Sequence, residues 1–227
     1  MKNIKLIACD IDGVLLEDTF SVVLNNMSKK LNFEYTSELE RNTFSQSREQ
    51  ALKYMSNILN IQNEDDAQHL LQTYFLERDK FIARNGNPIL EATLPFLERL
   101  KSLKVKLVCY GGLDIDMIDT RFLPYLKVFD QYICTDTFRP GLKEITKQFY
   151  NLEYSEVLFI DDVNKVAEEA KKYDIPFIGV PTKHTWGFQE QQMIETGVKY
   201  RVNGIQDITL DYLNTVAGDP EIWGRNR

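Results

Sequence analysis

The sequence predicts an α/β fold, in which a parallel sheet with helices on both faces carries a small all-helical cap. Downstream of residue 85, short apolar runs alternate with amphipathic segments, a pattern typical of βαβ units. Between the first apolar run and this alternation, residues 17–85 show helical periodicity and no convincing strand. Two of the apolar runs also end in paired aspartates, which points to a functional edge of the sheet.

The composition is that of a globular protein, with 43% hydrophobic residues in a chain of 227. No apolar run approaches the ~18 residues of a membrane span. The formal charge of −7 disfavours nucleic acid or an anionic membrane as the main partner. A small phosphorylated metabolite remains compatible with this charge, because a divalent cation can reverse the local field.

Three cysteines, Cys9, Cys109 and Cys134, each lie in an apolar run and form no CxxC pair. This usage is typical of buried thiols in a reducing compartment. Aspartates interrupt the N-terminal apolar run, which disfavours a signal peptide. We therefore expect a cytoplasmic protein, and the sequence contains no signal for its oligomeric state.

The cap is predicted from three helices. The first begins near Asp18, the second at Ser47, where Ser47 to Gln50 matches a capping box, and the third follows the acidic start at Asn63. The turn-forming run at residues 85–88 then ends the insertion. We assign residues 17–85 to the cap, and residues 1–16 and 86–227 to the α/β core.

The core is predicted from the alternation that follows the first strand at residues 4–9. The expected strands are residues 105–110, 131–134, 157–160, 177–180 and 200–202. The expected helices lie around residues 96–100, 115–123, 142–150, 166–170 and 208–213.

Paired acids follow two of these strands, Asp10 with Asp12 and Asp161 with Asp162. Each pair alone has an ordinary explanation, an Asx turn for the first and a helix N-cap for the second. Because parallel strands end at the same edge of a sheet, we expect the two pairs to converge. Hard oxygen donors at one edge suit Mg²⁺, which is the cofactor that the sequence predicts.

The two acidic motifs resemble those of the haloacid dehalogenase (HAD) superfamily of aspartate-nucleophile phosphatases. Residues 9–15, Cys-Asp-Ile-Asp-Gly-Val-Leu, are similar to the first family motif, and residues 159–162, Phe-Ile-Asp-Asp, to the fourth. Ala170 and Ile175-Pro176 continue the pattern of the fourth motif. The resemblance covers nearly the whole chain and implies a Rossmann-like core with a helical cap inserted after the first strand.

The resemblance also implies roles. Asp10 would be the nucleophile that forms an aspartyl-phosphate and a ligand of Mg²⁺. Asp12 would bind the metal through its backbone carbonyl and act as general acid and base with its side chain. Asp161 and Asp162 would complete the metal site. Dehalogenases of the family lack an acid at the position of Asp12, so this residue favours phosphoryl transfer from a small phosphomonoester.

The second family motif ends in a small hydroxyl residue, whereas this chain has Tyr110, Gly111 and Gly112. Either the Tyr110 phenol or the N–H groups of Gly111 and Gly112 could hold the phosphate, and Tyr110 could also simply pack in the core. The third motif offers a Lys, which Arg139 replaces here. Arg139 can bind phosphate bidentately, and Lys143, one helical turn on, is its competitor.

Other polar residues carry weaker signals. His69 and His184 are expected to be structural, and Asp114, Asp116 and Asp119 to be caps or exposed positions. Arg48 and Arg78 are expected on solvated helix faces, with binding of a distal anion of the substrate as the alternative. We therefore predict a Mg²⁺-dependent phosphatase. A phosphomutase of the same family and a catalytically weak regulatory protein that binds metal or phosphate are the alternatives.

Overall fold

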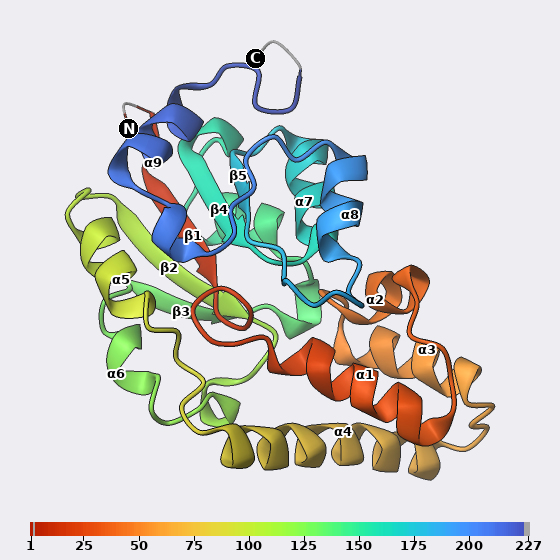
Figure 1. Cartoon of the computed structure of the whole chain (residues 1–227). Helices are drawn as coiled ribbons and strands as arrows, with labels where there is room; N and C mark the ends of the chain where they lie inside the picture. The colour runs from red at the N-terminus through yellow and green to blue at the C-terminus, as the bar shows by residue number, and fades with distance from the viewer. Residues whose placement is uncertain (2, 225–227) are drawn as a thin grey trace.

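A parallel sheet of five strands, in the order β3-β2-β1-β4-β5, forms the core of the computed structural model, which describes residues 1 and 3–224 (Figure 1). The strands are β1 (Leu6–Asp10), β2 (Lys106–Gly111), β3 (Gln131–Cys134), β4 (Val157–Asp161) and β5 (Phe177–Gly179). Helices surround the sheet, so the predicted α/β fold class is confirmed.

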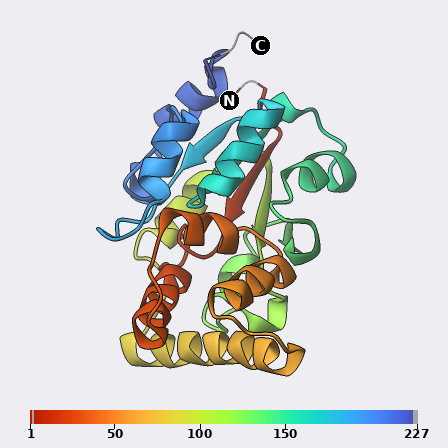
Figure 2. The ribbon, with the colours of Figure 1, turned by 90° about the vertical axis from the view of Figure 1, so that its right-hand side faces the viewer.

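The helices before β2 are α1 (Thr19–Leu31), α2 (Ser37–Thr43), α3 (Arg48–Ile58), α4 (Glu64–Asn85) and α5 (Thr93–Lys101). Those after it are α6 (Leu123–Leu126), α7 (Asn164–Tyr173), α8 (Gln189–Thr196) and α9 (Leu210–Gly218). None of the described helices is long and apolar enough to cross a membrane. In Figures 1 and 2, α4 lies at the end of the molecule opposite both chain termini.

Strand β1 is central because all five of its residues are buried and both of its edges are paired. Its register places Asp10 opposite Tyr110 of β2, and Cys9 opposite both Cys109 of β2 and Ile160 of β4. A strand buried on both faces needs a continuous apolar run, which the sequence supplies up to the acid at its end. The buried core therefore fixes where Asp10 emerges.

Helices α1 to α4, here called the cap helices, follow β1 and contain their own small hydrophobic cluster around Leu24, Leu39 and Met55. Three of them begin where the sequence predicts, because the side chains of Asp18, Ser47 and Asn63 accept hydrogen bonds from the first turns of α1, α3 and α4. Helix α2, which Thr36 caps, was not predicted.

The structure differs from the prediction in four core segments. The expected helix at residues 115–123 is a short 3₁₀ turn followed by α6, because Pro124 fits only the first turn of a helix. The segment Glu144–Phe149 is π-helical, and the expected strand at residues 200–202 is reduced to one bridge between Gly179 and Arg201. Helix α8 occupies a segment for which the sequence predicts no helix.

A buried carboxylate joins the cap helices to the core. Glu40 of α2 is 1% exposed and accepts hydrogen bonds from the Phe188 N–H at 3.0 Å and from Gln189 Nε2 at 2.8 Å. The Gln189 Oε1 atom accepts a hydrogen bond from the Asn164 N–H at 2.6 Å. Because Asn164 begins α7 just after the second acid pair, this chain of contacts ties α2 to the loop that carries the acids.

Replacing Glu40 by Ala should lower the free energy of unfolding by about 3 kcal/mol, since it leaves buried donors without an acceptor. Urea unfolding measures this loss. Glu38→Ala is the matched control, because Glu38 is an exposed residue of the same helix. Equal stabilities of the two variants would show that the Glu40 contacts do not hold the cap helices to the core.

Candidate active site

Three carboxylates meet at the carboxyl end of the central strands. Asp10 ends β1, Asp161 ends the neighbouring β4, and Asp162 follows it; all three are buried. Burial raises the pKa of Asp10 well above its usual range, and repulsion from Asp161 raises it further. Burial likewise raises the pKa of Asp162, and repulsion from Asp161 and Asp10 raises it further. The structure thus brings these three predicted site residues together.

Asp12 lies on the loop after β1, and a cap arginine holds its side chain. Its Oδ1 accepts a hydrogen bond from Arg78 Nη2 at 2.9 Å, and the Asp12 side chain is 13% exposed. Burial raises the pKa of Asp12, whereas the Arg78 guanidinium opposes that rise. Asp12 also lines the same cavity as Asp10, so it is placed to exchange protons with a ligand bound there.

Gly13 allows the loop after β1 to approach the second acid pair. Its φ is +87°, a conformation that favours glycine, and a Cβ at this position would lie 2.1 Å from Asp162 Oδ2. The first motif therefore needs glycine for both backbone conformation and space.

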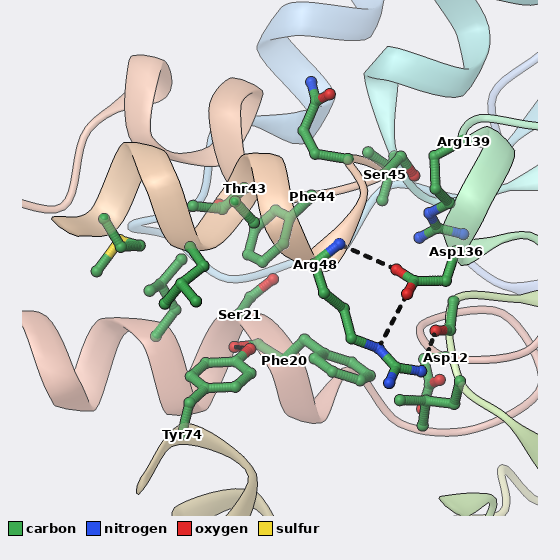
Figure 3. Close-up of a pocket in the computed structure, with 18 of the residues that line it drawn as sticks. Asp12, Phe20, Ser21, Thr43, Phe44, Ser45, Arg48, Tyr74, Asp136 and Arg139 are labelled. Atoms are coloured by element: carbon green, nitrogen blue, oxygen red, sulfur yellow. Dashed lines mark hydrogen bonds and ion pairs between the residues drawn. The ribbon is translucent and has the colours of Figure 1, made fainter. Parts of the chain in front are cut away.

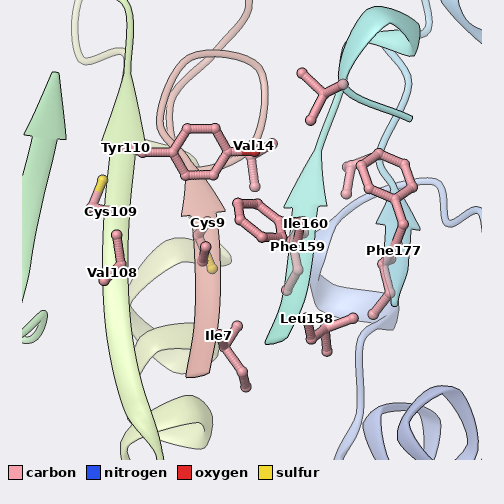
Figure 4. Packing of buried hydrophobic residues seen from close by; sticks show 14 of the residues in the cluster. Ile7, Cys9, Val14, Val108, Cys109, Tyr110, Leu158, Phe159, Ile160 and Phe177 are labelled. Atoms are coloured by element: carbon pink, nitrogen blue, oxygen red, sulfur yellow. The ribbon is translucent and has the colours of Figure 1, made fainter. Parts of the chain in front are cut away.

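Tyr110 is a buried residue that hydrogen-bonds to Asp161. Its ring reaches from β2 across the end of β1 and packs edge-on against Phe159, with ring centroids 5.6 Å apart (Figure 4). The buried phenol donates a hydrogen bond to Asp161 Oδ2 at 2.5 Å. Burial raises the pKa of Asp161 to about 6, while this hydrogen bond and one from the Val163 N–H act against the rise. Tyr110 is thus placed to hold Asp161, while its role in phosphate binding stays a prediction.

The buried acids fit a hard cation. Asp162 Oδ1 is buried and has no hydrogen-bond partner among the described residues, although such an oxygen ordinarily needs one. No group of three or more His, Cys, Asp or Glu side chains in the described part of the chain is arranged to hold a metal by itself. Mg²⁺ is commonly bound by only one or two carboxylates, with water and phosphate oxygens as its other ligands. The acid cluster is compatible with that mode.

Arg139 brings a positive charge to the acids. It lines the cavity, lowers the pKa of Asp10, and donates a hydrogen bond from Nη1 to Thr135 Oγ1 at 3.1 Å. Its Nε is buried without a partner among the described residues, which leaves a donor for an anion. Gly112 lets it come close, since a Cβ there would lie 3.3 Å from the guanidinium. Lys143, the predicted competitor, is exposed and does not line the cavity.

Gly111 and Gly112 end β2 beside this site. The Gly111 carbonyl accepts the N–H and hydroxyl of Thr135, and the Gly112 carbonyl accepts Arg48 Nη2 at 3.0 Å. A Cβ on Gly111 would meet Ile11 Cγ2 at 2.8 Å, so glycine is required there for packing. Binding of phosphate by their N–H groups stays a prediction.

Two cap arginines are less exposed than the sequence predicts, and both contact residues of the site. Arg78, expected on a solvated face, is 4% exposed, contacts Asp12 and Thr19, and lies 4.5 Å from the centre of the Phe20 ring. Arg48 lies in the cavity wall, where its backbone N–H and guanidinium contact Asp136 (Figure 3). The sequence does contain a hint that Arg78 is buried. Arg78 lies one helical turn after Tyr74 and so falls on the inward-facing stripe of α4.

The remaining polar candidates lie outside the acid cluster. His69 is exposed on α4, and His184 stacks on Trp186 with ring centroids 4.4 Å apart. Asp114 and Asp116 are exposed, while Asp119 pairs with Arg121. These placements agree with the structural roles that we expected from the sequence.

A cavity of about 180 Å³ extends from the acids into the cap helices (Figure 3). Its polar end contains Asp10, Asp12, Asp162, Arg139, Arg48 and Asp136. Side chains of α1, α3 and α4, together with residues 43–46, which run from the end of α2 toward α3, form most of the rest of its wall. A ligand can therefore place one end at Asp10 and the other between the cap helices.

Similar solved structures support this fold. A predicted phosphatase from Clostridium acetobutylicum superposes with a TM-score of 0.63 at 20% identity, covering 93% of this chain and 99% of that one. A β-phosphoglucomutase from Clostridium difficile gives 0.65 at 13% identity, covering 94% and 97%. A HAD hydrolase of family IA, variant 3, from Entamoeba histolytica gives 0.70 at 12% identity, covering 95% and 100%. At these identities the likeness concerns the fold.

Sequence comparison identifies the family. No curated protein is significantly similar to this chain. The family model described as haloacid dehalogenase-like hydrolase matches residues 4–172, a range that includes both acid pairs and all of the cap helices. Together with the parallel sheet and the acids at its edge, this match shows that the chain belongs to the haloacid dehalogenase-like hydrolases.

Proposed function

We propose that this protein is a Mg²⁺-dependent phosphatase that hydrolyses a small phosphomonoester through an aspartyl-phosphate on Asp10. The observation that carries the proposal is the pairing of Asp10, at the floor of the cavity, with Asp12, whose side chain Arg78 holds beside it. This reaction requires Asp10 as an unprotonated nucleophile, a form that the Arg139 charge favours because it lowers the pKa of Asp10, and a second carboxyl group that exchanges protons.

In the first step, a carboxylate oxygen of Asp10 attacks phosphorus, and the bond from phosphorus to the ester oxygen breaks. The departing alkoxide takes a proton from the Asp12 carboxyl group, so the alcohol leaves neutral. Burial raises the pKa of Asp12, which favours the protonated form that this step needs. Arg139, with its free Nε, is placed to bind the phosphoryl oxygens.

In the second step, the Asp12 carboxylate accepts a proton from water as that water attacks phosphorus. The bond between phosphorus and the Asp10 oxygen breaks, which releases inorganic phosphate and regenerates the Asp10 carboxylate. Arg78 keeps the Asp12 side chain in one position through both transfers, since it donates to Oδ1 and is itself fixed by Thr19.

Asp10, Asp161, Asp162 and the backbone carbonyl of Asp12 would hold the Mg²⁺. When bound, the cation offsets the repulsion between the anionic nucleophile and the anionic phosphate. Tyr110 then acts on the site through Asp161, whose Oδ2 its phenol contacts. Hydrogen-bonded partners of this kind orient metal ligands.

Replacing Asp10 by Asn should abolish phosphate release from phosphomonoesters, because the amide is not a nucleophile toward phosphorus. The measurement is free phosphate with Mg²⁺ and with a chelator, and the chelator should abolish the parent activity. Retention of near-parent activity by the variant, or full activity in chelator, would contradict the proposal. A product that keeps its phosphoryl group at a new position would instead identify a phosphomutase.

Replacing Arg78 by Gln should lower kcat by roughly a hundredfold while KM changes little, because Asp12 loses its orientation for proton transfer. Arg78→Lys should recover part of the lost rate by restoring the charge. Arg84→Gln is the control, since Arg84 is exposed on the same helix. Loss of rate that matches loss of folded protein would reduce Arg78 to a structural role.

Replacing Tyr110 by Phe should raise the Mg²⁺ concentration for half-maximal activity by roughly 10- to 100-fold, because Asp161 loses a hydrogen bond that orients it. Tyr132→Phe removes a phenol that donates to the Leu113 carbonyl at 2.6 Å, in the loop after β2, and not to an acid of the site, so it should leave the Mg²⁺ requirement unchanged. An equal Mg²⁺ requirement in both variants would argue that Tyr110 serves packing alone.

A further inference from the structure

The cavity has two chemically different ends. Away from the acids, most of its wall is formed by apolar side chains of three cap helices: Leu24 and Met27 of α1, Leu52 and Met55 of α3, and Leu71 and Phe75 of α4. We call this part the apolar chamber. Apolar side chains that line an open cavity gain free energy when a ligand removes them from water.

The polar groups beside the apolar chamber are already used within the protein. The Tyr74 phenol donates to the Phe20 carbonyl at 2.9 Å, and the Thr43 hydroxyl to the Leu39 carbonyl at 2.7 Å. The Gln46 amide donates to the Arg41 carbonyl at 3.0 Å. Asp18 accepts the Ser21 N–H as the cap of α1, and the Gln189 amide is bonded to Glu40 and Asn164. Ser21 and Ser45 add two short hydroxyls to the wall. That is too few for the several hydroxyls of a sugar, each of which loses free energy if buried without a partner.

Positive charge is confined to the acid end. Among the described residues that line the cavity, only Arg48 and Arg139 are cationic. Arg48 pairs with Asp136 and Asp114, which leaves Arg139 for the phosphoryl group. The apolar chamber therefore has no group to neutralise a second phosphate or a carboxylate at the far end of a substrate.

We propose that the substrate is a phosphomonoester of an apolar alcohol, with an alkyl or aryl group in the apolar chamber and no other charge. This inference rests on the proposed phosphatase function for the position of the phosphoryl group. The volume sets the size of the group: a cavity of roughly 150 Å³ holds a benzene molecule. The whole cavity here, with its acid end, measures about 180 Å³, so the alkyl or aryl group contains on the order of six carbons at most.

A series of unbranched alkyl phosphates tests the inference, because their leaving alcohols have nearly the same acidity. We expect kcat/KM for phosphate release to rise roughly fourfold per added methylene from ethyl to about hexyl, and then to level off. Glucose 6-phosphate, whose leaving oxygen is also that of an alcohol, should fall below hexyl phosphate. A flat alkyl series, or a preference for glucose 6-phosphate, would overturn the inference and leave the phosphatase proposal standing.

Two substitutions test whether the dependence on chain length arises in the apolar chamber. Leu71→Asn places a polar group in the apolar chamber and should remove the preference for hexyl over ethyl phosphate while ethyl phosphate is still hydrolysed. Ala51→Phe narrows the cavity and should end the rise at a shorter chain. The control is Leu76→Asn, because Leu76 lies on the same helix, is 53% exposed and does not line the cavity. An unchanged chain-length profile in both cavity variants would overturn the assignment.

Binding separates this inference from the proposed function. If no ester is hydrolysed, calorimetric titration with ethylphosphonate and hexylphosphonate in the presence of Mg²⁺ still reports on the cavity. Tighter binding of hexylphosphonate, lost in Leu71→Asn and kept in Leu76→Asn, would support the apolar chamber although the phosphatase proposal fails. Equal binding of the two phosphonates would overturn the inference.

Discussion

The burial of like charges at the end of β1 and β4 is the constraint on which the rest of the site depends. Burial raises the pKa of Asp10, Asp161 and Asp162, and repulsion from Asp161 raises the pKa of Asp10 and of Asp162 further. An anionic cluster of this kind persists only where partners offset it. Arg139 supplies charge and Tyr110 supplies a hydrogen bond, and a divalent cation is the partner that fits the unpaired Asp162 oxygen.

The cap helices cover the acids and also supply a positive charge to one of them. Arg78 reaches from α4 to Asp12, so the residue proposed as acid and base is oriented by a part of the chain that lies outside the sheet. Glu40 joins α2 to α8 by buried hydrogen bonds. A buried ion pair loses much of its value when one partner moves away, which makes a displaced cap incompatible with a correctly held Asp12. The cover over the site and the orientation of the residue proposed as its proton donor are therefore linked.

The same helices give the cavity its chemical contrast. Arg48 of α3 contacts Gly112 and Arg78 of α4 contacts Asp12, both near the acids. Apolar side chains of the same helices line the apolar chamber. A ligand with one charged end and one apolar end satisfies both regions without leaving a buried polar group unpaired. This complementarity would explain how a chain with a formal charge of −7 could bind the proposed phosphate ester: only the immediate surroundings of its phosphoryl group would need to be positive.

The sequence alone determined the α/β class, the starts of three cap helices and the convergence of the acid pairs, because these follow from local periodicity, capping residues and the shared edge of parallel strands. Only the tertiary structure decided which side chains complete the site. Arg78 looked like a surface residue until packing brought α4 over the loop of Asp12. The Tyr110 ring packs in the core, as one reading of the sequence allowed, and the register of β2 with β1 brings its phenol to Asp161. Such contacts join residues far apart in the chain, and no local pattern encodes them. The two carboxylates that end the first strand are thus readable from the sequence, but their partners are set by the fold.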